Sequence, residues 1–112
     1  MRGACYNNRN GGLNMIEIIN VEKKGYGYEI DKPIKAMSAV GSYAYLNELK
    51  SIFGIMVKWE RKGSFSTENS NKLIDKYFVY VLKTDEAKLL RYTLYIDMYH
   101  RWNDETKPED FE

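Results

Sequence analysis

The segment Leu89–Tyr99 constrains the fold of this chain most, because two kinds of side chain alternate along it without a break. The even-numbered residues from Leu90 to Met98 are apolar or aromatic, whereas the odd-numbered residues from Arg91 to Tyr99 carry charged, hydroxyl-bearing or phenolic groups. Successive side chains of a strand point to opposite faces of a sheet, so this period predicts a strand with one face on a core. The chain is therefore expected to fold around a β-sheet.

A second strand is predicted at Lys76–Lys83, where the inner residues are apolar at odd and even positions alike. This pattern is typical of a strand covered on both faces and indicates a central position in the sheet. Looser alternation predicts further strands at 15–21, 26–31 and 55–60, and the Lys-Lys-Gly turn signal at 23–25 favours pairing of the first two as a hairpin.

One helix is predicted at Ser38–Phe53, the only segment with a clear period of 3.6 residues. Its expected buried stripe consists of Ala39, Tyr43, Leu46, Leu49 and Phe53. Gly54 follows the last stripe residue and suits the end of a helix, whereas Gly41 inside it costs about 1 kcal/mol relative to alanine. The expected fold class is α+β, a single domain with a five-stranded, largely antiparallel sheet in the order β-β-α-β-β-β and one helix on one face.

Both ends of the chain are expected to lie outside the domain, which spans residues 15–102. Residues 1–14 have no helical or strand period, and we interpret them as a disordered tail or as an upstream-translated extension before a true start at Met15. Residues 103–112 are acidic and predict a loose C-terminal tail, and the polar segment 64–72 predicts a long loop.

Charge and residue counts exclude several classes of site. The 17 Lys and Arg against 16 Asp and Glu leave a net charge of +1, which disfavours a protein that acts mainly on phosphates unless it carries a local basic patch. One cysteine, Cys5, and one histidine cannot form an internal disulfide or a Cys/His zinc site. No metal or cofactor motif is present, and no apolar run approaches the roughly 20 residues of a membrane helix. A soluble protein of the bacterial cytoplasm is expected.

An area comparison points to the surface of greatest interest. Five strands present roughly 480 Å² per face, whereas a helix of this length covers roughly 220 Å². The face away from the helix would then expose aromatic side chains, which favours an interface with a second copy or another protein. Coverage by the chain's own loop or tail is the alternative. The expected interface residues are Phe78, Tyr80, Tyr95 and Tyr99.

Basic residues next to tryptophans suggest nucleic-acid contacts as the first alternative function. Lys58, Arg61 and Lys62 surround Trp59, and Arg101 precedes Trp102. Such cations bind phosphates while rings stack on bases. Both tryptophans are nevertheless expected to serve the structure, because alternation sends Trp59 to the core side and Trp102 can close the end of the sheet.

A small-molecule site is the second alternative, with Asp97 and His100 as the candidate ligand-binding residues. Their positions on opposite faces of the predicted strand argue against a dyad within it. No nucleophile motif or phosphate-binding loop accompanies them, so an enzyme is not expected. The sequence therefore predicts a small non-enzymatic interaction protein whose Tyr-rich sheet face binds itself or a protein partner.

Overall fold

The computed structural model of the chain describes residues 4–7, 15–67 and 71–112. In chain order its elements are β1 (Ala4–Asn7), β2 (Met15–Val21), β3 (Ile34–Lys35), α1 (Ser38–Glu48), β4 (Ile55–Ser66), β5 (Leu73–Lys83) and β6 (Lys88–Asp97). Counted from Met15, this is the predicted order β-β-α-β-β-β with a single helix, and the α+β class is confirmed.

The strands form one sheet in the order β1-β2-β6-β5-β4. β4, β5 and β6 run antiparallel, and the four-residue turn 84–87 joins the last two. β5 pairs with one edge of β6 from end to end, so β2 and the short β3 share the other edge, both parallel to β6. β5 is an interior strand, paired with β4 and β6, as its apolar residues on both parities predicted, although β6 and not β5 lies in the middle of the order.

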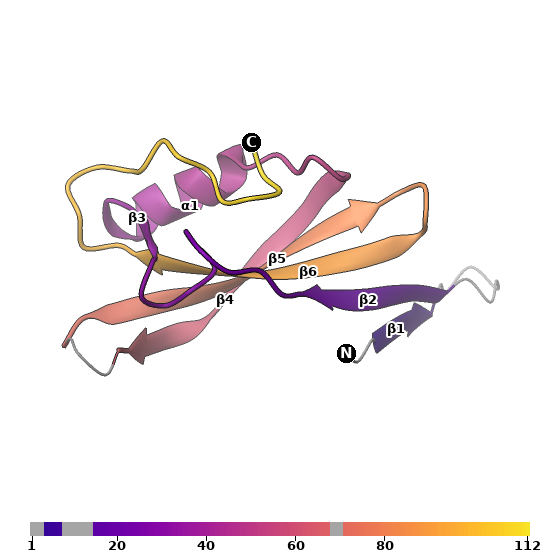
Figure 1. The fold of residues 1–112 in the computed structure, drawn as a ribbon, viewed down its shortest axis with the longest axis horizontal. Coiled ribbons are helices and arrows are strands. Elements are labelled where there is room, and N and C mark those ends of the chain that lie inside the picture. The colour runs from indigo at the N-terminus through magenta and orange to yellow at the C-terminus, as the bar shows by residue number, and fades with distance from the viewer. Residues whose placement is uncertain (1–3, 8–14, 68–70) are drawn as a thin grey trace.

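The hydrophobic core lies on one face of the sheet, beneath α1 and the C-terminal segment 98–112 (Figure 1). We call this side the covered face and the opposite side the outer face. The core residues are Tyr28, Ile34, Ala36, Tyr45, Leu46, Leu49, Tyr77, Val79, Val81, Tyr92, Leu94, Ile96 and Phe111. The even-numbered residues of β6 from Leu90 to Ile96 face this core, as their alternation predicted.

The prediction of a loose C-terminal tail is wrong, because residues 104–111 pack on the covered face. Phe111 is 7% exposed and its ring meets Tyr92 edge to face at 5.0 Å. The backbones of Lys50 and Glu112 exchange two hydrogen bonds of 3.0 and 2.8 Å. The acidic composition of the segment did not predict this packing, because its buried apolar residues are only two, Pro108 and Phe111.

Four tyrosines hold this segment in place through their hydroxyl groups. The Tyr26 hydroxyl donates to Asp104 Oδ2 at 2.8 Å, and that of Tyr45 to the Thr106 carbonyl at 2.7 Å. The remaining two bonds run from Tyr28 to the Glu109 carbonyl and from Tyr92 to Asp110 Oδ2. Part of the high tyrosine content therefore serves internal packing, because a phenol buries a ring while keeping one polar contact.

The predicted strand at 26–31 is also wrong, since the chain forms turns there. Gly25 and Gly27 adopt positive φ values of 98° and 82°, which favour glycine and interrupt an extended chain. Glu29 stabilises the turn by accepting a hydrogen bond of 2.6 Å from the Gly25 amide. β2 therefore has no hairpin partner in this segment and pairs in parallel with β6 instead.

α1 is shorter than predicted and buries a different stripe. It ends at Glu48, and its buried residues are Gly41, Ser42, Tyr45 and Leu46. Tyr43 and Phe53, expected in the core, are 38% and 42% exposed. Close approach of the C-terminal segment explains the rotation, because a Cβ on Gly41 would lie 2.6 Å from the side-chain oxygen of Asn103. Asn103 also donates to the Gly41 carbonyl at 2.8 Å.

The segment predicted as a long polar loop is partly strand. β4 continues through Ser66, beyond the expected end at residue 60, while residues 68–70 lie outside the described part of the chain. Ala4–Asn7 pair antiparallel with β2, so part of the segment expected to lie outside the fold adds a strand to the sheet edge. The rest of residues 1–14 falls outside the described residues.

Candidate functional site

The strand register gathers aromatic and basic side chains on the outer face. Pairing of β4 with β5 and of β5 with β6 places residues in three rows across the sheet, which are Gly63–Lys76–Tyr95, Glu60–Phe78–Thr93 and Lys58–Tyr80–Arg91. Phe78, Tyr80 and Tyr95 thus share one face, as strand parity predicted. α1 and residues 98–112 both lie on the other side of the sheet (Figure 1).

Phe78 stands at the centre of these rows with three cations around its ring. The Arg91 guanidinium carbon lies 4.8 Å from the ring centroid, Lys62 Nζ lies at 5.2 Å and Lys76 Nζ at 5.6 Å. All three distances fall within the roughly 6 Å over which a cation is attracted to the face of an aromatic ring. We call Phe78, Lys62, Lys76 and Arg91 the Phe78 cluster.

Neighbouring side chains fix this cluster in position. The Arg91 Nε donates to Asn20 Oδ1 at 2.6 Å, and Lys76 also lies 5.7 Å from the ring centroid of Phe65. Phe65 is 45% exposed and extends the aromatic surface toward the end of β4. A second ring thus accompanies Phe78 along the same face.

An irregularity in β4 accounts for the position of Lys62. The register shifts between Arg61 and Gly63, so that Lys62 is the extra residue of a bulge opposite β5. Bulges redirect side chains and are common at sheet edges and functional sites. Here the bulge leaves Lys62 over the ring of Phe78.

Glu60 is the one acidic residue that contacts the Phe78 cluster within the described part of the chain, and it also binds Tyr80. The Tyr80 hydroxyl donates to Glu60 Oε1 at 2.7 Å, and Lys62 Nζ lies 3.9 Å from the same oxygen. This hydrogen bond lowers the pKa of Glu60, while burial, followed by the same bond, raises the pKa of Tyr80. At neutral pH the carboxylate is therefore charged and the phenol keeps its proton.

The outer face is consequently much more basic than the chain as a whole. Its rows and bulge carry four cations, Lys58, Lys62, Lys76 and Arg91, against the one carboxylate of Glu60. That difference leaves an excess of three positive charges, whereas the complete chain has a net charge of +1. The local basic patch that the overall charge did not reveal lies on this face.

Only two of the four predicted nucleic-acid contacts belong to this patch. Lys58 and Lys62 lie on the outer face, whereas Arg61 turns to the covered face and pairs with buried Asp75 at 3.2 Å. Arg101 is exposed in the segment that follows β6. Sequence reasoning missed Lys76 and Arg91, although the same parity that selected Phe78 and Tyr95 would have selected both.

The two tryptophans behave differently from each other. Trp59 is structural as predicted, because its ring stacks on Tyr43 at 5.1 Å and its Nε1 donates to Asn47 at 2.8 Å. Trp102 was expected to close the end of the sheet but is 53% exposed, with its ring 5.3 Å from that of His100.

Tyr99, predicted as an interface residue, is not part of the outer face. β6 ends at Asp97, and Tyr99 forms an isolated bridge with Met37 at the start of α1. The predicted strand was too long because alternation in composition continues past the last strand residue. Tyr99 is 59% exposed in its new position.

Asp97 and His100 do come together, contrary to the argument from parity. His100 Nε2 lies 2.9 Å from Asp97 Oδ2, because the chain turns after Asp97 and folds back along Ala36. Asp97 also accepts from the Tyr99 amide and lies 3.7 Å from Lys72 Nζ. No hydroxyl or thiol in the described residues hydrogen-bonds the imidazole, so this pair secures the end of β6 and lacks a nucleophile.

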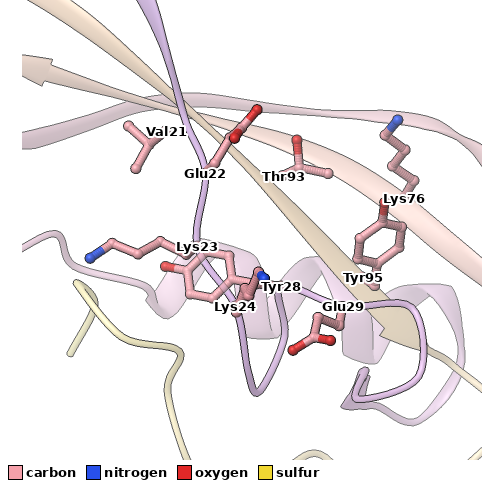
Figure 2. A pocket seen from close by; sticks show the side chains of 9 residues that line it. All are labelled: Val21, Glu22, Lys23, Lys24, Tyr28, Glu29, Lys76, Thr93 and Tyr95. Atoms are coloured by element: carbon pink, nitrogen blue, oxygen red, sulfur yellow. The ribbon is translucent and has the colours of Figure 1, made fainter. Parts of the chain in front are cut away.

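A cavity of about 550 Å³ opens beside the outer face, at the edge of β6 (Figure 2). It is lined by Val21, Glu22, Lys23, Lys24, Tyr28, Glu29, Lys76, Thr93 and Tyr95. Lys23 is engaged with Glu109 and Asp110, and Glu29 with Lys32 and the Gly25 amide. The hydrogen bond from that amide, together with the nearby Lys32, lowers the pKa of Glu29, so its carboxylate is charged at neutral pH.

Neither a cluster of metal-ligating side chains nor a membrane-spanning helix is found in the described part of the chain. Its histidine, cysteine and acidic side chains do not gather in groups of three or more that could hold an ion. Within the same residues, no helix has the length and apolar character needed to cross a bilayer. Comparison with protein-family models, with curated proteins and with solved structures finds no match to this chain, so the functional argument rests on its own side chains.

Proposed function

We propose that this protein is a non-enzymatic module that binds single-stranded nucleic acid on the outer face of its sheet. The observation that carries the proposal is the Phe78 cluster, an aromatic ring with three cations 4.8–5.6 Å from its centre. A single-stranded nucleic acid carries binding partners for both kinds of side chain at short intervals, since its bases stack on rings while its phosphates pair with lysine and arginine.

The arrangement favours a single strand over a duplex. Rings that project from a sheet need unpaired bases to stack on, and duplex bases are already stacked on one another. Phe65, Phe78 and Tyr95 lie on the same face and belong to three different strands, so successive bases can meet them in turn. The cations beside these rings then neutralise the intervening phosphates.

The charge of the outer face argues against its use for self-association. Two copies docked through this face would bring two surfaces with three excess positive charges each into contact, and like charges across an interface are unfavourable. The expectation of a homodimer through Phe78, Tyr80 and Tyr95 is therefore less well supported than an anionic partner. An acidic protein would satisfy the cations but would make no specific use of the rings beside them.

Fluorescence anisotropy with labelled 12-nucleotide dT and rU strands tests the proposal. Four cations and a slope of about −0.7 per neutralised phosphate predict that log K falls with log salt with a slope of about −3. Phe78→Leu removes the ring but keeps an apolar side chain, and it should weaken binding by about 1–3 kcal/mol.

The chain offers a matched control elsewhere. Phe53 carries its own cation, with Lys83 Nζ 5.8 Å from the ring centroid, and it lies outside the outer face. Phe53→Leu should leave binding unchanged. The proposal is overturned if the folded protein binds neither strand at low salt, or if Phe78→Leu binds as tightly as Phe53→Leu. Tight binding of an acidic peptide that survives Phe78→Leu would identify a protein partner instead.

A further inference from the structure

We infer that the cavity at the edge of β6 receives one base of the bound strand and favours a base with an exocyclic amino group. The inference rests on the proposed function, since it names which nucleotides the same face prefers. Cytosine, adenine and guanine carry such an amino group, whereas thymine and uracil do not.

The cavity exists because β2 leaves the edge of β6 before β3 takes its place. β2 pairs with β6 as far as Val21 and Tyr92, and contact resumes where the Tyr95 amide donates to the Gly27 carbonyl at 2.8 Å. The intervening residues 22–26 stand away from the strand. The resulting volume of about 550 Å³ lies inside the range of roughly 300–1,000 Å³ typical of small-ligand sites.

The cavity is continuous with the Phe78 cluster. Lys76 lines the cavity while its Nζ lies 5.6 Å from the Phe78 ring centroid, and Thr93 is the cross-strand neighbour of Phe78. A strand with one base on Phe78 and a phosphate at Lys76 therefore has its next base at the mouth of the cavity.

The lining of the cavity supplies a ring and an unoccupied acceptor. Figure 2 shows the Tyr95 ring beside Lys76, and the Glu22 carboxylate on the side of the cavity where Thr93 lies. Within the described residues Glu22 makes no hydrogen bond or ion pair, whereas Glu29 already accepts from the Gly25 amide. A carboxylate can only accept hydrogen bonds, so it pairs with an amino group such as cytosine N4 and repels the carbonyl at the same position of thymine.

Two homopolymers separate this inference from the proposed function. Labelled 12-nucleotide dC and dT strands carry the same number of phosphates and pyrimidine rings, and they differ in the group at position 4 and in the 5-methyl group of thymine, which Glu22→Gln leaves in place. At pH 7.5 the wild-type protein should bind dC about tenfold more tightly than dT. Glu22→Gln should bring this ratio close to one, because an amide donates to a carbonyl as readily as it accepts from an amine.

Glu17→Gln is the control for the lost charge, since Glu17 lies on β2, is exposed and does not line the cavity. It should keep the dC to dT ratio of the wild type. Equal affinity of the wild type for both strands, with Phe78 still required, would overturn the inference and leave the proposed function standing. Absence of binding to both strands would overturn the proposed function itself.

Discussion

The two faces of β5 carry alternating residues of one strand, yet they are aromatic for different reasons. Tyr77, Val79 and Val81 are fully buried on the covered face, under α1 and the C-terminal segment. Phe78 lies between them in sequence but faces the opposite way, among lysine and arginine side chains. Apolar residues at both odd and even positions therefore identify a strand that is paired along both edges. They do not show what covers each of its two faces.

The tyrosines make the same contrast. On the covered face, four phenols donate to residues 104–110 and lock the end of the chain over the core. On the outer face, Tyr80 donates to Glu60 and Tyr95 lines the cavity. The phenols of the covered face stabilise the fold, whereas on the outer face Tyr95 borders the cavity and Tyr80, 9% exposed, is held by its bond to Glu60. Stability and binding should consequently respond to different substitutions.

The largest effect is expected from truncating the aromatic anchor of the C-terminal segment. Phe111→Ala removes a 7% exposed ring that packs on Tyr92, and it should lower the free energy of unfolding by about 3–5 kcal/mol. Urea denaturation followed by circular dichroism measures this loss. Phe65→Ala on the outer face, 45% exposed, should cost less than about 1 kcal/mol. Equal losses of unfolding free energy in the two variants would contradict the assignment of the core to the covered face alone.

A smaller effect is expected when the covered face is titrated with alkali. Burial raises the pKa of Tyr28, Tyr45 and Tyr92 above the ordinary value of 10.0, and that of Tyr77 to about 12. The folded state thus holds protons that the unfolded chain releases, so stability is fully present below pH 10 and falls above it. Each such phenol contributes a slope of about 1.4 kcal/mol per pH unit, and for Tyr77 the fall ends near pH 12.

Unfolding free energies measured between pH 9 and pH 12 test this slope. Tyr92→Phe removes one of the titrating phenols. The fall of the unfolding free energy with pH should become shallower by the slope of one phenol, about 1.4 kcal/mol per pH unit. A profile for Tyr92→Phe that coincides in shape with the wild type would show that this phenol does not titrate with unfolding.

The smallest effect is expected from removing one charge of the outer face. Arg91→Gln takes one cation from the Phe78 cluster and should reduce the steepness of the salt dependence by about 0.7. The free energy of unfolding should fall by about 1 kcal/mol, because the half-buried side chain loses its hydrogen bond to Asn20. Lys83→Gln, which leaves the outer face intact, should alter neither binding nor its salt dependence.

Strand positions and parity could be predicted because they depend on local geometry. Alternation over Leu90–Ile96 correctly assigned the core face of β6, and with it the outer position of Tyr95. Predictions failed where the chain bends. The turns at Gly25 and Gly27 replaced an expected strand, and the reversal after Asp97 brought His100 back to it.

The candidate site was predicted only in part. Parity placed Phe78 and Tyr80 together, but Lys76 and Arg91 were not selected because neither stands in a conspicuous basic cluster along the chain. Arg61 stands in such a cluster and turns the other way, to Asp75. Sequence neighbours on a strand point to opposite faces, so a cluster in sequence is divided between two surfaces.

The amino-acid sequence by itself determined that this chain forms a largely antiparallel sheet with one helix, and which residues of each strand share a face. Both follow from the two-residue period of an extended backbone, a property of neighbouring residues. Only the tertiary structure decided that the C-terminal segment covers one face and that Lys62, Lys76 and Arg91 surround one ring on the other. Those contacts depend on strand order and register, which are set by packing between segments far apart in the chain.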